Sequence, residues 1–366
     1  MDVALLDALR EIALVDQHAH SVLRAHPATL DEFRGLFSES ADPRQWPHVA
    51  TAVSYRRGIE QVAEELGCEP SEDAVFEFRR SSPPREYAGR LLRATGTEEL
   101  FLDDGFPPAG VAYSLEEMAE LADCATRPVL RIERVAEEAL AEGRGLDALR
   151  ERVREDVAAA RSRGYVGLKT IAAYRTGLAV SRPTDAEVSA ALAATGQRLD
   201  AKPLVDLVLN EALEVNAAEP LPLQVHSGFG DGDLLLPAAN PALLKPVIER
   251  FRETPFVLLH CYPFVREAGW LAHVYANVFL DVSLTIPHVA RPAEMVRQAL
   301  ELAPVSKLMY ASDAARAPEL YFLGARRWRE ALAEVLPEIP GDQAASARAI
   351  LRENARALYG GGAADA

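Results

Sequence analysis

The chain has 366 residues, of which 49% are hydrophobic, so it is long enough to bury a large core. It is strongly acidic, with 55 Asp and Glu against 39 Lys and Arg and a formal charge of −16. Nucleic acids and anionic membrane surfaces need a basic partner, so we expect neither as a binding partner. We interpret the acidity as charge that keeps surface helices soluble.

The cysteine pattern and the N-terminal residues indicate in which compartment the protein is located. Cys68, Cys124 and Cys261 are odd in number and widely spaced, which fits neither a disulfide framework nor a thiolate zinc site. Residues 1–16 carry charges among their apolar positions and lack the pattern of a signal peptide. No apolar run approaches the roughly 20 residues that cross a bilayer. We therefore expect a cytoplasmic protein.

Short apolar runs alternate along the chain with longer stretches of helical periodicity. Eight runs are candidate strands: 13–20, 99–105, 129–134, 165–172, 221–228, 256–262, 278–284 and 307–313. Strands that alternate with helices over such a length predict an α/β fold, a closed (β/α)₈ TIM-like barrel. An open doubly wound sheet is the alternative, but its Gly-rich turn after the first strand is absent.

One connection is much longer than the others. Residues of about 21–98 separate the first two expected strands and include a helical stretch at 51–67 and a breaker cluster at 79–86. A structureless loop of this length is improbable in a compact domain. We predict a helical lid over the C-terminal face of the barrel, within one domain that spans 1–366.

Residues that can bind a metal end five of the expected strands. They are His18 and His20 in the first strand, Lys169 in the fourth, His226 in the fifth, His260 in the sixth and Asp313 in the eighth. Side chains two apart on a strand share a face, so we expect both histidines of the first strand to point the same way. In the sixth strand we expect Val257 and Leu259 to face outward and His260 to face inward.

This set of side chains predicts a metal centre at the C-terminal mouth of the barrel. Imidazole and carboxylate groups suit Zn²⁺ or another divalent first-row ion. The alternative is a barrel rim of polar groups without a ligand. Ligand-type residues on five different strand ends favour the metal, and we expect Zn²⁺.

The same residues resemble the amidohydrolase superfamily, whose barrels carry ligands in this strand order, here from VDQHAH to ASDAARAPE. Four stretches are similar to its amidohydrolase-2 branch: FRGLFSES (33–40), GLKTIAAYRTGL (167–178), HSGFGDGD (226–233) and HCYPF (260–264). Within the branch they most resemble the amidohydrolase-like region of FluG/nodulin-type glutamine synthetase fusions. The resemblance implies a metal-dependent hydrolase barrel.

A metal ion held in this way lowers the pKa of bound water to about 7 and polarises a carbonyl oxygen. The resemblance implies that Asp313 takes a proton during attack and delivers it to a leaving amine. Lys169 leaves two possibilities, because an ammonium group does not fit beside a divalent cation. Either Lys169 is carboxylated and bridges two metals, or one metal is bound by the other ligands and His260 polarises the substrate.

Weaker signals lie around the predicted centre. Tyr174 and Arg175 follow the fourth strand, where an arginine can clamp a substrate carboxylate or pair with an acid of the lid. Arg131 and Glu133 share a face of the expected third strand and either reach the substrate or form ion pairs within the barrel. The glycines of 228–233 superficially resemble a phosphate cradle but lack the Lys-Ser/Thr of a P-loop.

We predict a hydrolase that cleaves a C–N amide bond in a small polar substrate. The resemblance implies an amide of glutamyl type. Two alternatives stay open: a mononuclear metal-dependent decarboxylase or lyase of the same superfamily, and a non-catalytic barrel that binds a metabolite. The expected partners are a small-molecule substrate and, as an option, further copies of the chain in a homo-oligomer. Fold and family do not determine the substrate.

Overall fold

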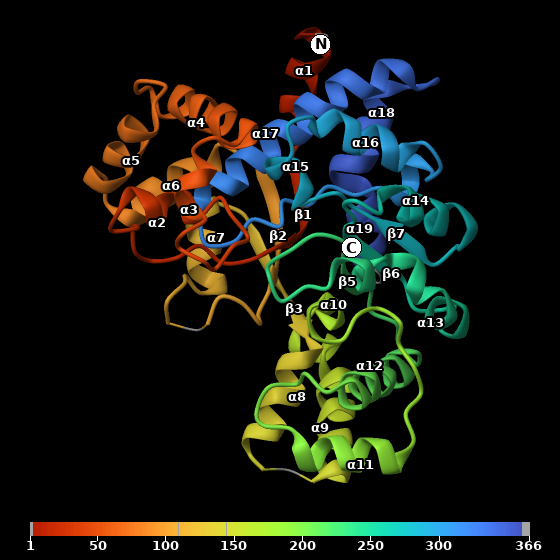
Figure 1. The fold of residues 1–366 in the computed structure, drawn as a ribbon. Helices are drawn as coiled ribbons and strands as arrows, with labels where there is room; N and C mark the ends of the chain where they lie inside the picture. The colour runs from red at the N-terminus through yellow and green to blue at the C-terminus, as the bar shows by residue number, and fades with distance from the viewer. Residues whose placement is uncertain (1–2, 109, 144, 361–366) are drawn as a thin grey trace.

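The computed structural model describes residues 3–108, 110–143 and 145–360, and seven parallel strands form its curled sheet (Figure 1). Their order in the sheet is their order in the chain: β1 Leu14–Ala19, β2 Thr97–Asp103, β3 Ala125–Arg131, β4 Gly167–Thr170, β5 Leu223–Ser227, β6 Phe256–His260 and β7 Val278–Leu280. Parallel neighbours need crossover connections, and helices supply them. The α/β class expected from the alternating pattern is therefore confirmed.

Helices surround the sheet, and the last of them packs against the inward-facing side chains Val257 and Leu259 through Tyr359. After β2 they are α7 Leu115–Ala122, α8 Ile132–Ala141, α9 Leu146–Ala159, α10 Ala172–Arg175, α11 Asp185–Ala194, α12 Lys202–Asn216, α13 Lys245–Arg250, α14 Val265–Val274, α15 Thr285–His288, α16 Pro292–Leu300, α17 Pro318–Val335, α18 Gln343–Arg348 and α19 Asn354–Tyr359. Helix α1 (Val3–Arg10) precedes the sheet. No helix of the described residues has both the length and the apolar character that a membrane crossing requires.

The eighth expected strand, 307–313, is not formed as a strand. The segment lies between the two edges of the sheet, where Leu308 makes an isolated parallel bridge to Leu280 of β7. On its other side the Asp313 N–H donates to the carbonyl of His18 in the region of β1 at 2.9 Å. The closed eight-stranded barrel is thus not confirmed, and the described sheet has seven strands.

Competing hydrogen bonds explain why this segment forms no regular ladder. The Tyr310 N–H donates to the carbonyl of Ile350, which lies in the C-terminal helical region, at 2.9 Å. The Ser312 N–H donates to the carboxylate of Asp16 instead of a backbone carbonyl, also at 2.9 Å. Both donors are taken by groups outside a strand ladder, and an apolar pattern in the sequence does not reveal such partners.

Five helices lie between β1 and β2, in the segment that we expected to be helical. They are α2 Leu30–Gly35, α3 Trp46–Val49, α4 Val53–Leu66, α5 Glu72–Ser81 and α6 Pro84–Arg93. They form a group beside α17, drawn in orange in Figure 1, and share an apolar cluster with α7 and α17. We refer to residues 21–96 as the insertion; its action as a lid stays a prediction.

A buried ion pair joins the insertion to α17. Arg79 of α5 donates from Nη1 to both carboxylate oxygens of Glu319, at 2.6 and 2.8 Å. The side chains are 2% and 0% exposed, and the Tyr87 hydroxyl donates to the same carboxylate at 2.8 Å. Removal of one partner from such a pair leaves a buried charge without compensation.

We expect Arg79→Met to lower the free energy of unfolding by about 3–5 kcal/mol, because Glu319 stays buried without its cation. Urea unfolding followed by circular dichroism measures this change. Arg44→Met is the matched control, since the side chain of Arg44 is 91% exposed beside Asp42 and its loss should leave the midpoint unchanged. Equal midpoints for the two variants would contradict the role of the Arg79–Glu319 pair.

Candidate metal centre

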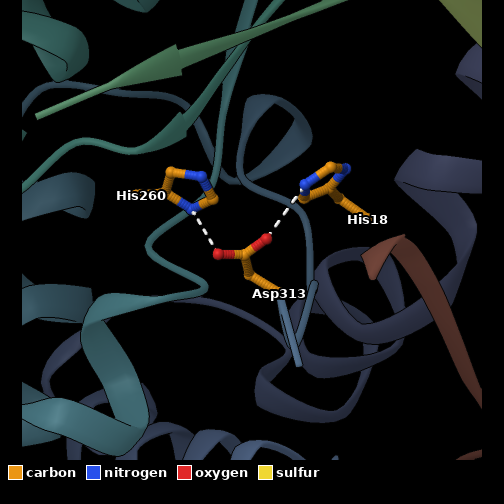
Figure 2. Close-up of side chains that lie close together, drawn as sticks. All are labelled: His18, His260 and Asp313. Atoms are coloured by element: carbon orange, nitrogen blue, oxygen red, sulfur yellow. Dashed lines mark ion pairs between the residues drawn. The ribbon is translucent and has the colours of Figure 1, made fainter. Parts of the chain in front are cut away.

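The carboxylate of Asp313 lies between histidines that come from other parts of the sheet (Figure 2). Its Oδ1 is 2.9 Å from His18 Nε2 and 3.3 Å from His20 Nε2. Its Oδ2 is 3.6 Å from Nδ1 of His260 at the end of β6. The expectation that His18 and His20 point to one place is confirmed.

The other two predicted ligands lie in the same cluster. The ring centroids of His226 and His260 are 4.5 Å apart, and the buried Nε2 of His226 has no hydrogen-bond partner among the described residues. Lys169 Nζ is 3.1 Å from His18 Nε2. The structure therefore brings all six predicted ligand residues together.

Two local departures from regular strand geometry make this convergence possible. The pairing register of β1 with β2 shifts between Asp16 and Ala19, so simple alternation does not hold there. His260 has φ 66° and Asp313 has φ 48°, both in the left-handed region that non-glycine residues rarely adopt. Backbone strain of this kind concentrates at functional sites.

The sixth strand corrects our expectation about alternation. Val257 and Leu259 belong to an apolar cluster with Met309 and Tyr359, while Leu258 belongs to the cluster that faces the helices. Val257 and Leu259 therefore face the inside of the sheet, opposite to the prediction. His260 still enters the site because its positive φ ends the alternation.

The hydrogen-bond partners of His18 determine which ring nitrogen carries the proton. The backbone carbonyl of Gln17 can only accept a hydrogen bond, and the nitrogen Nε2 of Gln224 donates to it. The other end of the Gln224 amide, the oxygen Oε1, therefore faces His18. This Oε1 is 2.8 Å from His18 Nδ1 and accepts a hydrogen bond from it. The lone pair of His18 is then on Nε2, the atom that faces Asp313.

The partners of the two other histidines have the same effect. His20 Nδ1 lies 3.3 Å from the carbonyl of Phe106, to which it donates. Ser283 Oγ donates to Asp281 at 2.7 Å and therefore accepts from His260 Nδ1 at 2.8 Å. In each ring the proton is on Nδ1 and the lone pair is on Nε2.

These protonation states test whether the cluster fits a metal ion. The Nε2 lone pairs of His18 and His20 face Asp313 Oδ1 at 2.9 and 3.3 Å, so acceptor meets acceptor. Lys169 Nζ, 3.1 Å from His18 Nε2, can donate to that one lone pair, but it makes no ion pair with the carboxylate within the described residues. Protonation of His18 does not resolve the conflict, because burial and the nearby Lys169 lower its pKa to about 4. A cation between the acceptors removes the repulsion, and imidazole nitrogens with a carboxylate are donors that bind divalent ions. The residues present fit the metal.

Electrostatics keep the remaining members of the cluster in ligand form. Burial lowers the pKa values of His226 and His260 well below the usual histidine value, so both rings are neutral. Asp313 faces these rings with both carboxylate oxygens, Oδ1 toward His18 and His20 and Oδ2 toward His260. Burial lowers the pKa of Lys169 to about 8, against the opposing effect of nearby carboxylates. Neutral imidazole and ionised carboxylate are the forms that bind metals.

The comparisons with known proteins agree with this chemistry. The amidohydrolase family model matches residues 15–361. The chain belongs to the amidohydrolase family. It is 31% identical to the protein FluG of Emericella nidulans over 98% of the chain and 47% of FluG, and so spans about half of that protein. A crystal structure from Lactobacillus casei, described as a candidate metal-dependent hydrolase, has a TM-score of 0.89 at 30% identity over 97% of each chain.

A second carboxylate of the candidate metal centre in this amidohydrolase, Asp103, was not predicted from the sequence. Asp103 ends β2 and can share an ion with His18 and His20, since candidate ligand atoms of the three lie within 4.8 Å of one another. It also forms a buried ion pair with Arg131, with Nη2 and Oδ2 2.6 Å apart. An acid at a predicted strand end was the available signal.

The cluster of predicted ligand side chains borders a cavity of 340 Å³, which we call the inner cavity. Of the predicted substrate-binding residues, Tyr174 and Arg175 line it. Arg175 also donates to Glu137 of α8 at 2.9 Å, so its acid partner is not in the insertion. Glu39 and Arg316 line the cavity as well, and neither was predicted. Their sequence positions alone gave no sign of this, because they are far apart in the chain.

Glu133 is placed differently from the prediction. It lies in the first turn of α8, because β3 ends at Arg131, and its carboxylate accepts from the Ile171 N–H at 3.0 Å and from Thr170 Oγ1. It is 2% exposed and does not line the inner cavity. Glu133 thus supports the loop after β4, and Arg131 forms an ion pair within the barrel, with Asp103, as one of the two alternatives had it.

The glycines of 228–233 have packing roles. A Cβ on Gly228, which has φ 75°, would lie 2.2 Å from the carbonyl oxygen of Tyr262. A Cβ on Gly230 would lie 2.1 Å from the hydroxyl of Tyr174. Glycine at these positions allows the loop after β5 to approach its neighbours closely, and this explains the motif without a phosphate.

We expect Gln224→Met to lower the affinity for Zn²⁺ by about 10–100-fold, because His18 loses the acceptor that sets its protonation state. Competition with a coloured chelator measures the affinity. Gln197→Met is the control, because Gln197 is exposed. An unchanged affinity in the Gln224 variant would show that this hydrogen bond does not orient the ligand.

Proposed function

We propose that the chain is a metal-dependent hydrolase that cleaves a C–N amide bond, of glutamyl type, in a small polar substrate. The observation that carries the proposal is the carboxylate of Asp313 among neutral imidazoles beside the inner cavity. The membership of the amidohydrolase family supports hydrolysis. The arginines that line the cavity support a substrate that carries a carboxylate group near its amide bond.

The ligands divide into two neighbouring groups. We assign His18, His20 and Asp313 to one divalent ion, and His226 with His260 to a second. Lys169, in carboxylated form, is the group that joins them, and its lowered pKa near 8 supplies the neutral amine that reacts with CO₂. Predominantly nitrogen ligands favour Zn²⁺. Such ions supply Lewis-acid activation of water and of a carbonyl oxygen.

Asp313 is the general base and acid in this proposal. It lies among the predicted metal ligands, and the ionised carboxylate is the form that binds a divalent ion. It accepts a proton from water as the water attacks the amide carbon, and then delivers the proton to the leaving nitrogen. The position of Asp313 at the cavity wall gives it access to both partners.

We expect chelation of the purified protein to abolish hydrolysis of a panel of γ-glutamyl and dipeptide amides, and Zn²⁺ to restore it. Asp313→Asn should lower kcat by about 10²–10⁴-fold, because the proton acceptor is lost. Release of amine is measured alongside release of CO₂ from aromatic acids. Production of CO₂ without any amine release would instead indicate the decarboxylase alternative.

The carboxylated lysine has its own test. We expect the native protein, kept at neutral pH, to show the mass increment of one CO₂ on the peptide that contains Lys169. Lys169→Met should reduce the bound metal from two ions to one, because the bridging group is absent. Elemental analysis of the variant and the parent protein gives the stoichiometry. One ion in both proteins, with an unmodified lysine, would refute the two-metal arrangement.

A further inference from the structure

Arg316 lines the inner cavity without an acidic partner. Its guanidinium donates from Nη2 to the carbonyl of Ser38 at 3.3 Å, and its buried Nε has no partner among the described residues. Its backbone is fixed at φ 67°, and its N–H donates to the Ser21 carbonyl at 3.2 Å. A guanidinium held at a cavity wall with an unsatisfied buried N–H suits an incoming carboxylate, which it can bind through two parallel hydrogen bonds.

The two other arginines of the inner cavity are already paired. Arg131 holds Asp103 at 2.6 Å, and Arg175 holds Glu137 at 2.9 Å. Arg316 makes no ion pair among the described residues, and its electrostatic interaction with Glu39 involves no hydrogen bond. Arg316 is therefore the arginine of this cavity that has no acid in direct contact.

Glu39 presents the opposite charge in the same cavity. It lies in the insertion, directly after Ser38, and its carboxylate makes no hydrogen bond or ion pair within the described residues. Burial raises its pKa, while the neighbouring His288 and Arg316 act against this rise. A carboxylate with open acceptor positions at a cavity wall suits a cationic N–H donor.

His288 adds a second acceptor near Glu39. Its Nδ1 donates to the carbonyl of Leu284 at 2.8 Å, so the lone pair is on Nε2. This Nε2 is buried and has no partner among the described residues. Glu39 and His288 both line a larger neighbouring cavity of 1280 Å³, which shares Glu39 with the inner cavity. An ammonium group has three N–H donors and can use both acceptors.

We propose that Arg316 and Glu39 form a subsite for the head group of an α-amino acid. Arg316 binds the α-carboxylate, and Glu39, assisted by His288, binds the α-ammonium group. The substrate class is then an amide whose acyl part keeps both groups free, as in a γ-glutamyl amide. The inference rests on the proposed hydrolase function only in naming an amide as the bond that is cleaved. Recognition of the head group is independent of it, because Arg316 and Glu39 are not predicted metal ligands.

Three matched p-nitroanilides test the subsite on the zinc-loaded protein: γ-glutamyl, glutaryl, which lacks the ammonium group, and 4-aminobutyryl, which lacks the carboxylate. We expect the parent protein to prefer the γ-glutamyl compound by about 10–100-fold in kcat/KM over each analogue, as for one charged hydrogen-bonded contact. Glu39→Gln should lose the preference over the glutaryl compound alone. Arg316→Met should lose the preference over the 4-aminobutyryl compound alone, and Arg316→Lys should recover part of it.

Controls separate recognition from a change in fold. Glu60→Gln and Arg182→Met remove an exposed acid and an exposed arginine outside both cavities, and they should keep the parent preferences. Circular dichroism checks that each variant is folded. If Glu39→Gln and Arg316→Met both keep the parent preferences, the subsite is wrong and the hydrolase proposal stands.

Binding without turnover distinguishes the two proposals. Calorimetry compares L-glutamate, glutarate and 4-aminobutyrate on the same zinc-loaded proteins. If no amide is cleaved but L-glutamate binds and each variant weakens it by at least about 10-fold, the subsite is supported and the hydrolase proposal fails. If no amide is cleaved and L-glutamate does not bind, the subsite is overturned as well.

Discussion

The site depends on the direction in which its buried histidines donate their protons. His18, His20 and His260 each donate from Nδ1 to a group outside the centre, so each keeps a lone pair on Nε2. Buried side chains of the sheet determine these donor directions, and among them Asp281 accepts hydrogen bonds from both Gln17 and Ser283. One buried carboxylate is thus connected to two ligands. The acceptor-rich centre is a property of this network as much as of the ligands themselves.

The same helix positions both parts of the proposed subsite. Helix α17 begins at Pro318, directly after the loop that contains Arg316. It also holds the insertion, through the Arg79–Glu319 pair and through Arg327, which donates to the Ser54 carbonyl at 2.7 Å. These buried polar contacts attach the helices of the insertion to α17. The segment next to Glu39 contacts the loop before α17 directly, where Arg316 Nη2 donates to the Ser38 carbonyl at 3.3 Å.

The sequence was sufficient to predict which residues gather in the candidate metal centre, because ligand-type residues stand at strand ends. Six ligand-type residues stood at the ends of apolar runs, and parallel strands bring such ends to one edge of the sheet. Side-chain orientations were predicted wrongly where the strands lose the regular in-and-out alternation of their side chains. The prediction for Val257 counted back from an inward-facing His260 and assumed regular alternation, which the positive φ of His260 breaks. Glu133 was predicted to lie in the third strand but lies in α8. Local pattern carries no information about these changes.

Glu39 and Arg316 show a different limit, which is long-range position. They are far apart in the chain and line the same cavity because the insertion packs on α17. No periodicity or motif links an acid after α2 to an arginine after the last extended segment. Their chemistry became informative only when the structure showed which other arginines of the cavity already had acidic partners.

The balance of charge beside the cluster also explains why Lys169 is the sensitive member. Asp103 is neutralised by Arg131, which leaves Asp313 as the principal negative group that faces the histidines. A protonated Lys169 would add positive charge next to any bound cation, and burial already disfavours its ammonium form. Carboxylation reverses the sign of this side chain, and a neutral amine removes its charge. Either state relieves the repulsion, so the number of ions that the centre holds is decided by the chemistry of one lysine.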